Sequence, residues 1–183
     1  LEAGEKTRTA LYKLGMAYYN QGALDKACAN LTKAAENADD EMAQNAWLHA
    51  GIAYLRLIKK ADAQKAFRNA AQMNASKSVK EMALYDYALT LHEQASPQTV
   101  RVMEDFLNEF PSSQYAVSVS KCLTQAYMSK KDYTKALSAI SKVKSPNADA
   151  QDDKQAVLYN LAFQELNAGR TEQALKYAGE AVA

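Results

Sequence analysis

Apolar and small residues recur along the chain at spacings of three and four, which is the pattern of an amphipathic helix. The clearest stretch runs from Leu11 to Ala34. Its apolar positions are Leu11, Leu14, Gly15, Tyr18, Ala27, Leu31 and Ala34. The pair Gln21-Gly22 interrupts the pattern with a turn signal. The stretch therefore predicts two antiparallel helices that pack closely where Gly15 and Ala27 remove bulk.

The same offsets return four more times. Trp47, Gly51, Tyr54 and Phe67 repeat the first set without a gap, and the third set slips by one residue near Ser96-Pro97. In the fourth set Thr124 replaces the glycine, and in the fifth Glu165 replaces the tyrosine. The pattern predicts five units, at residues 8–43, 44–77, 78–111, 112–146 and 147–183. It predicts ten helices, at 6–21, 24–37, 41–58, 60–74, 77–94, 97–110, 113–129, 133–144, 149–167 and 171–182.

A period in the mid-thirties, split into two helical halves, indicates a helix-turn-helix repeat. With Trp47, Gly51, Tyr54, Ala63, Phe67 and Ala70 in order, the chain resembles the tetratricopeptide repeat family over nearly its full length. The resemblance implies an all-α fold, a right-handed superhelical α-solenoid of five units that forms a single array over 1–183. It also implies a non-catalytic scaffold that binds an extended peptide or a helix of a protein partner.

In this family the first helix of each unit lines a concave groove. The residues carried over to that groove by position are Tyr12, Met16, Tyr19, Leu55, Tyr85, His92, Lys121, Met128, Tyr159 and Phe163. Five further positions complete the row: Leu48, Ile52, Leu89, Gln125 and Leu166. The other interpretation is that several of these residues only pack between neighbouring first helices. That interpretation weighs most for Leu48, Ile52 and Leu89.

The carboxylate clamp of chaperone-binding family members is not expected here. That clamp uses Lys and Asn in the first unit and basic residues two units later. This chain has Tyr12 and Met16, then Met82 and Asp86, at the matching places. A chaperone tail is therefore not the expected partner.

No residue set predicts catalysis, a cofactor or a metal site. The chain lacks a glycine-rich phosphate loop, GxSxG and HExxH. His49 and His92 are expected on solvated or groove-lining helix faces. The acidic clusters Asp39–Glu41 and Asp149–Asp153 lie near predicted helix starts, where they are expected to cap helices. Cys28 and Cys122 are expected as small core residues without a disulfide.

Composition excludes further partners. The net charge is +1, which gives no field to attract nucleic acid, and no apolar run approaches the roughly 20 residues of a membrane span. Charge alternates along the units, at −1, +5, −4, +5 and −3. This alternation favours correct stacking of the units, and a banded surface read by a partner is the alternative.

The ends predict a piece of a longer array, because the last helix carries Leu175 and Val182 without a polar cap and Leu1–Gly4 offers little cover. Such ends also favour an end-to-end homodimer.

The segment Phe106–Ala116 resembles the unit junction of bacterial envelope repeat proteins, the Tol-Pal coordinator and outer-membrane assembly lipoprotein type. It favours the bacterial periplasm or cell envelope, with the cytoplasm as the alternative. Two other functions stay open, an architectural spacer or oligomerisation module, and an accessory segment of an enzyme whose catalytic domain lies elsewhere.

Overall fold

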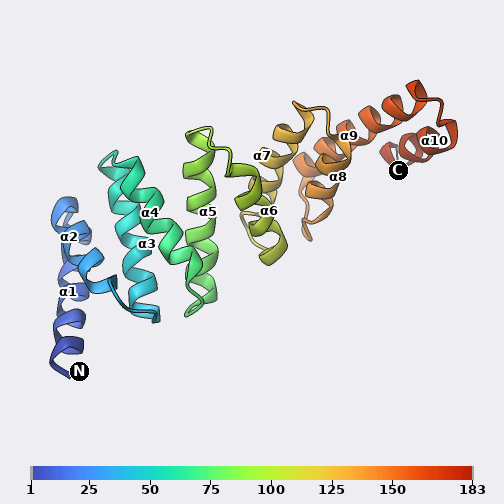
Figure 1. Ribbon diagram of the computed structural model, residues 1–183. Coiled ribbons are helices and arrows are strands. Elements are labelled where there is room, and N and C mark those ends of the chain that lie inside the picture. Colours follow the sequence, from blue (N-terminus) through green and yellow to red (C-terminus); the bar gives the residue numbers. More distant parts are fainter. Residues whose placement is uncertain (1, 183) are drawn as a thin grey trace. The chain divides into compact units, whose positions relative to one another are not determined.

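Every regular element in the described part of the chain, residues 2–182 of the computed structural model, is an α-helix (Figure 1). The predicted all-α fold is confirmed. The helices are α1 (Glu2–Gln21), α2 (Leu24–Ala35), α3 (Glu41–Arg56), α4 (Lys60–Gln72), α5 (Lys77–Glu93), α6 (Thr99–Glu109), α7 (Ala116–Met128), α8 (Tyr133–Ser141), α9 (Ala148–Asn167) and α10 (Thr171–Ala181). They form two compact units that divide between Thr99 and Val100, and each is described by itself. The single array stays a prediction.

Each hairpin turns through one residue with a left-handed backbone. These residues are Gly22, Ile58, Ala95, Lys131 and Gly169, at intervals of 36, 37, 36 and 38 residues. At the first turn the Ala23 N–H donates to the Tyr18 carbonyl at 2.9 Å, and the Gly22 N–H donates to the Tyr19 carbonyl at 3.1 Å. The same two bonds recur at all five turns. They are the bonds of a Schellman motif, which ends a helix and turns the chain back.

The predicted helix boundaries are wrong mainly between α6 and α9. α7 begins three residues later than predicted, because the Ser113 hydroxyl accepts the Tyr115 N–H at 3.0 Å in a local turn. α8 ends at Ser141, and the chain then leaves the helix so that the Lys144 N–H donates to the Pro111 carbonyl at 3.0 Å. α1 begins four residues before its prediction.

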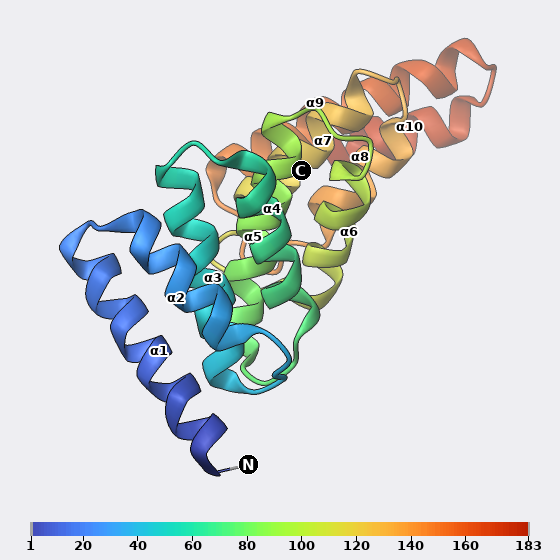
Figure 2. The same ribbon diagram turned by 60° about the vertical axis from the view of Figure 1, so that its left-hand side comes forward.

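In the unit up to Thr99, successive helices of α1 to α5 lie side by side (Figure 2), and alanine-rich faces of α2, α3 and α4 pack together. A buried cluster joins α2, α3 and α4, with α1 packed on its edge. Its members are Ala27, Leu31, Ala34, Ala35, Ala43, Ala46, Ala50 and Ala66. Short side chains let the helices approach closely, and the larger Leu31 fills the space beside Gly15. The predicted packing positions of α2 are therefore confirmed.

Leu14 was predicted to pack inside its unit, and this prediction is wrong. Its side chain is 45% exposed, whereas Ala50, at the matching place of α3, is fully buried. The reason is that Ala50 belongs to the buried cluster that α2, α3 and α4 form, whereas Leu14 lies outside that cluster.

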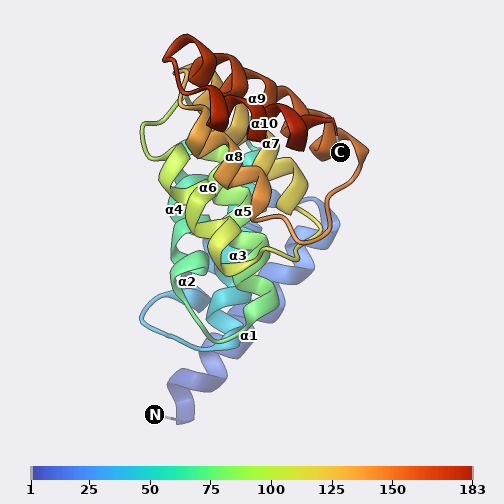
Figure 3. The same cartoon turned by 90° about the vertical axis from the view of Figure 1, so that its right-hand side faces the viewer.

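In the other unit, Phe106, Leu107 and Phe110 are buried, and the rings of the two phenylalanines lie 5.6 Å apart. α9 and α10 form an antiparallel pair (Figure 3). Of the predicted packing positions on α10, Ala174 is buried, but Ala178 is exposed and Ala181 is only half-buried. The prediction is wrong for the last two, because no described helix covers that side of α10.

Candidate protein-interaction surface

Three of the predicted groove residues share one face of α1. Tyr12, Met16 and Tyr19 are each half-buried and pack against the cluster that α2 and α3 build. Their spacing of four and three residues puts them in one row along the helix. Part of each side chain therefore supports the fold, and part faces solvent.

The contact between α1 and α3 is aromatic and polar at one end. The ring of Tyr19 meets the ring of His49 edge-on, with centroids 5.5 Å apart and an angle of 89°. The guanidinium carbon of Arg56 lies 5.8 Å from the Tyr19 ring centroid. His49 Nδ1 donates to the Asn45 carbonyl at 2.9 Å, which fixes the ring orientation. These contacts pre-order Tyr19 from the side of α3.

The other first-helix positions of this unit differ in burial. Leu48 is 2% exposed, so this residue packs between helices, as the other interpretation predicts. Ile52, Leu55, Tyr85 and Leu89 are half-buried, and His92 is exposed. The surface along α1, α3 and α5 thus carries half-covered apolar and aromatic side chains.

Asp86, next to Tyr85 on α5, is half-buried. Burial raises the pKa of its carboxyl to about 6. By repeat register it lies on the side of α5 that faces α3, as His49 faces α1. In the sequence, Asp86 stands out only as a departure from the clamp pattern. The feature of the sequence that could have indicated its burial is a single acidic residue among the apolar positions of a helix.

The predicted groove residues of the second unit fall into two groups. On α7, Lys121 and Gln125 are exposed and Met128 is half-buried. On α9, Tyr159 is 69% exposed and Phe163 57%, and with Leu166 they line an open apolar groove of about 320 Å³ against α10. Six of the ten predicted residues therefore belong to the unit up to Thr99, and four to the other.

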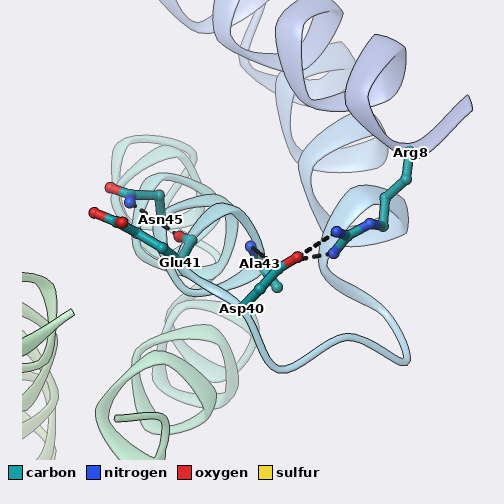
Figure 4. A network of polar contacts seen from close by, with 5 residues as sticks. All are labelled: Arg8, Asp40, Glu41, Ala43 and Asn45. Carbon is teal, nitrogen blue, oxygen red and sulfur yellow. Dashed lines mark hydrogen bonds and ion pairs between the residues drawn. The ribbon is translucent and has the colours of Figure 1, made fainter. Parts of the chain in front are cut away.

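The first acidic cluster has the predicted capping role. The Asp40 side chain accepts the Ala43 N–H at 2.8 Å at the start of α3, and Arg8 of α1 forms a two-pronged ion pair with the same carboxylate (Figure 4). In the second cluster the cap is Asn147, which accepts the Ala150 N–H at 3.0 Å, while Asp149 lies in the first turn of α9. Among the side chains that the structure describes, no three of His, Cys, Asp or Glu are grouped to hold a metal ion.

The two cysteines are free thiols. Cys28 is buried, and burial raises its pKa to about 11. Cys122 is half-buried, and burial raises its pKa as well. Both are therefore thiols rather than thiolates at neutral pH, and neither is an activated nucleophile.

None of the described helices combines the length and the apolar character that crossing a bilayer requires.

Residues 9–40 match the sequence model of the tetratricopeptide repeat. This match supports the tetratricopeptide repeat family. The fold is similar to solved structures across nearly the whole chain. The structure of MamA protein has a TM-score of 0.58 at 15% identity, over 97% of this chain and 91% of that one. The RS-1 MamA ArsTM double mutant has a TM-score of 0.57 at 15% identity, over 96% and 93%.

A third similar structure contains nearly identical TPR-like repeats of a protein described as a kinesin light chain of Podosopora anserina. It has a TM-score of 0.53 at 14% identity, over 99% of this chain and 95% of that one. These likenesses show the fold, an α-solenoid of TPR-like helix pairs. A comparison with curated protein sequences gave no match.

Proposed function

We propose that this chain is a protein-interaction scaffold, and that the unit up to Thr99 holds an extended or helical segment of a partner along α1, α3 and α5. The observation that carries the proposal is the row of half-buried aromatic and apolar side chains on these three helices, with Tyr12, Tyr19 and Tyr85 as its largest members. Tyrosine suits such a surface because it is large, rigid and polar at its tip. Anchors of this kind carry most of the binding energy in many protein interfaces.

Asp86 gives the proposed surface a charge preference. Its carboxyl is partly buried, so a cation brought by a partner would meet it at low solvent exposure. Ion pairs that exclude water are stronger than exposed ones. The partner segment that we propose therefore carries a Lys or Arg near an aromatic or aliphatic anchor.

The test is a selection of random peptides displayed on phage against the immobilised 183-residue chain. Enriched peptides are synthesised, and their Kd is measured by calorimetry with the wild type and with a Tyr85→Ala, His92→Ala double variant. We expect the Kd to rise at least about tenfold in that variant, because it removes an anchor residue. Tyr12 is left intact, since it also packs on the cluster of α2 and α3.

The matched control is a Lys33→Ala, Arg68→Ala double variant, which removes two exposed side chains from the second helices α2 and α4. Its Kd should stay within about twofold of the wild type, since surface truncations away from an interface change little. Thermal unfolding followed by circular dichroism checks that both variants fold. Equal affinity of the groove variant and the wild type, or loss of binding in the control alone, would overturn the proposal.

A place in the bacterial envelope is a further expectation, and the interaction proposal does not depend on it. It comes from the junction Phe106–Ala116. Phe106, Leu107 and Phe110 of that junction are buried, so packing alone is a sufficient reason for them.

A further inference from the structure

The hairpin α1–α2 and the hairpin α9–α10 are the same structural unit, displaced by 147 residues. Gly22 and Gly169 turn them with φ of 78° and 75°. The Arg170 N–H donates to the Glu165 carbonyl at 2.9 Å, which repeats the bond from Ala23 to Tyr18. Each position of one hairpin therefore has a defined counterpart in the other.

In α1–α2, the side of α2 that faces α3 is sealed. The five α2 residues of that side, all at most 3% exposed, are Ala27, Cys28, Leu31, Ala34 and Ala35. α3 covers them with Ala43, Ala46 and Ala50, which belong to the same buried cluster. The Cys28 sulfur lies 3.9 Å from the carbonyl oxygen of Ala50, so the two helices are in direct contact.

In α9–α10, the matching side is open apart from Ala174, the counterpart of Ala27, which is buried. Leu175, the counterpart of Cys28, is 69% exposed, and Val182, the counterpart of Ala35, is 86% exposed. Together with Tyr159, Phe163 and Leu166 of α9 they line the apolar groove of about 320 Å³. So many large apolar side chains on one face are typical of a surface that another helix covers.

α1 offers a helix face that matches the one α3 uses. Thr7, Ala10, Leu14 and Ala17 stand 36 residues before Ala43, Ala46, Ala50 and Ala53. All four are exposed on α1, whereas their four counterparts on α3 are buried. The chain therefore has two open faces that correspond to the two sides of the α2–α3 contact. The face on α9–α10 corresponds to the side that α2 provides, and the face on α1 corresponds to the side that α3 provides.

We propose that α1 of one copy packs on α9–α10 of another copy, in the way that α3 packs on α1–α2. At one pair of positions the side chains agree in size, because Leu31 and Ala50 of the internal cluster are replaced by Ala178 and Leu14, again one leucine and one alanine. Volume-conserving exchanges of this kind preserve close packing. The charges agree as well, since α1 has three basic and two acidic residues, and α9 and α10 together have six acidic and two basic residues.

The contact joins two different faces, so it is heterologous, and it leads either to an open series of oligomers or to a closed ring. The 183-residue chain should therefore self-associate in a concentration-dependent way. This surface is distinct from the proposed peptide groove along α1, α3 and α5.

The test uses two variants that each destroy one face, Leu14→Glu on α1 and Leu175→Glu on α10. Both residues are exposed, so the fold should survive, and circular dichroism checks this. Sedimentation velocity should show each variant alone as a monomer, with self-association weakened by about a hundredfold or more, because a buried charge without a partner is costly. A mixture of the two should give a one-to-one heterodimer and nothing larger. Ile58→Glu, a control at another exposed apolar residue, should associate like the wild type.

A second measurement does not use charge. In a Cys122→Ser background, a chain with Leu14→Cys and a chain with Ala178→Cys are mixed under mild oxidation. A disulfide-linked dimer that forms in the mixture and in neither variant alone supports the proposal. A wild type that stays monomeric over about a hundredfold range of concentration overturns it. So does Leu14→Glu self-association equal to that of the wild type, because symmetric pairing of the α9–α10 faces would then be the contact.

Discussion

The α-carbon of Gly51 on α3 lies directly against the aromatic ring of Phe67 on α4. A Cβ added at Gly51 would be 2.6 Å from two ring carbons. Phe67 is fully buried, so its ring cannot move into solvent. Gly15 and Leu31 meet in the same way in the preceding hairpin, where the added Cβ would be 2.7 Å from Leu31 Cγ. The repeat therefore depends on one missing side chain in the first helix and one large side chain in the second.

Gly51→Ala should lower the free energy of unfolding by about 2–3 kcal/mol, because overpacking a close helix contact outweighs the better helix propensity of alanine. Urea unfolding followed by circular dichroism measures the change. Gly179→Ala on α10 is the control, since a Cβ there meets nothing within 4 Å. That variant should gain about 0.5–1 kcal/mol from helix propensity. A Gly51→Ala chain as stable as the wild type would contradict the close contact.

Ile58 occupies the turn position that Gly22 and Gly169 occupy in their own hairpins. It is a β-branched residue with φ of 61°, and its side chain is 80% exposed. Ile58→Gly should raise the free energy of unfolding by about 0.5–1 kcal/mol, because it relieves left-handed strain and gives up little burial. Chemical unfolding measures this gain. The reciprocal variant Gly22→Ile should lose about 1 kcal/mol or more. A destabilised Ile58→Gly chain would show that the isoleucine side chain contributes more than its backbone costs.

Spacing and residue size predicted the ten helices and the close approach at Gly15 and Gly51, because each of these follows from local periodicity and from the size of single residues. The turn at Ile58 carries no turn signal in the sequence. The spacing did not predict what depends on a neighbouring hairpin. Leu14 has the same local pattern as Ala50, and only the presence or absence of a covering helix separates them. The predicted groove residues lie on the first helices of the pairs, as the register indicates. The register does not predict how far each of them is buried.

The spacing of apolar residues also did not predict the hydrogen bonds of buried polar side chains. Gln44 is fully buried, and its amide donates to the carbonyls of Ala70 and Met73 at 3.0 and 2.9 Å. Its side-chain oxygen accepts the Ser76 N–H at 2.7 Å. One side chain thus satisfies backbone groups at the end of α4 and just before α5. Nothing in the spacing of apolar residues marks a glutamine for that role, because the partners are backbone atoms about 30 residues later.

The ion pair of Arg8 and Asp40 joins α1 to the start of α3 and should make stability depend on pH. The hydrogen bond from Arg8, followed by that from the Ala43 N–H, holds the pKa of Asp40 below its usual value. A carboxyl with a lowered folded-state pKa stabilises the fold above its unfolded pKa of about 4, and this contribution disappears as the pH falls through the folded value. Wild-type stability should therefore fall more steeply below pH ~4 than that of Asp40→Asn.

Asp40→Asn keeps an acceptor for the Ala43 N–H and should cost less than about 1 kcal/mol at neutral pH, because the pair with Arg8 is partly exposed. Asp40→Ala also removes the cap and should cost about 1–2 kcal/mol. Unfolding curves at a series of pH values measure both effects. Identical acid slopes for the wild type and Asp40→Asn would show that the ion pair contributes nothing to the fold.

Asp86 should act on stability in the opposite direction. Burial raises the pKa of its folded-state carboxyl to about 6, above the unfolded value. The folded state then holds the proton more tightly than the unfolded state between the two values, so stability falls as the pH rises from about 4 to 6 and is level above. Asp86→Asn should remove this slope and gain about 1–2 kcal/mol at pH ~7, a figure reduced for partial solvent screening. Asp62→Asn, at an exposed carboxylate of α4, is the control and should leave the slope unchanged.

The same variant tests the charge preference proposed for the groove. A bound peptide with a Lys or Arg beside Asp86 would favour the ionised carboxylate, so its affinity for the wild type should rise as the pH passes from below to above about 6. For Asp86→Asn the affinity should be lower and independent of pH in that range. Calorimetric titrations with one selected peptide at several pH values measure both curves. If the two proteins bind the peptide equally at every pH, the cation lies elsewhere, and the groove would bind through its aromatic side chains alone.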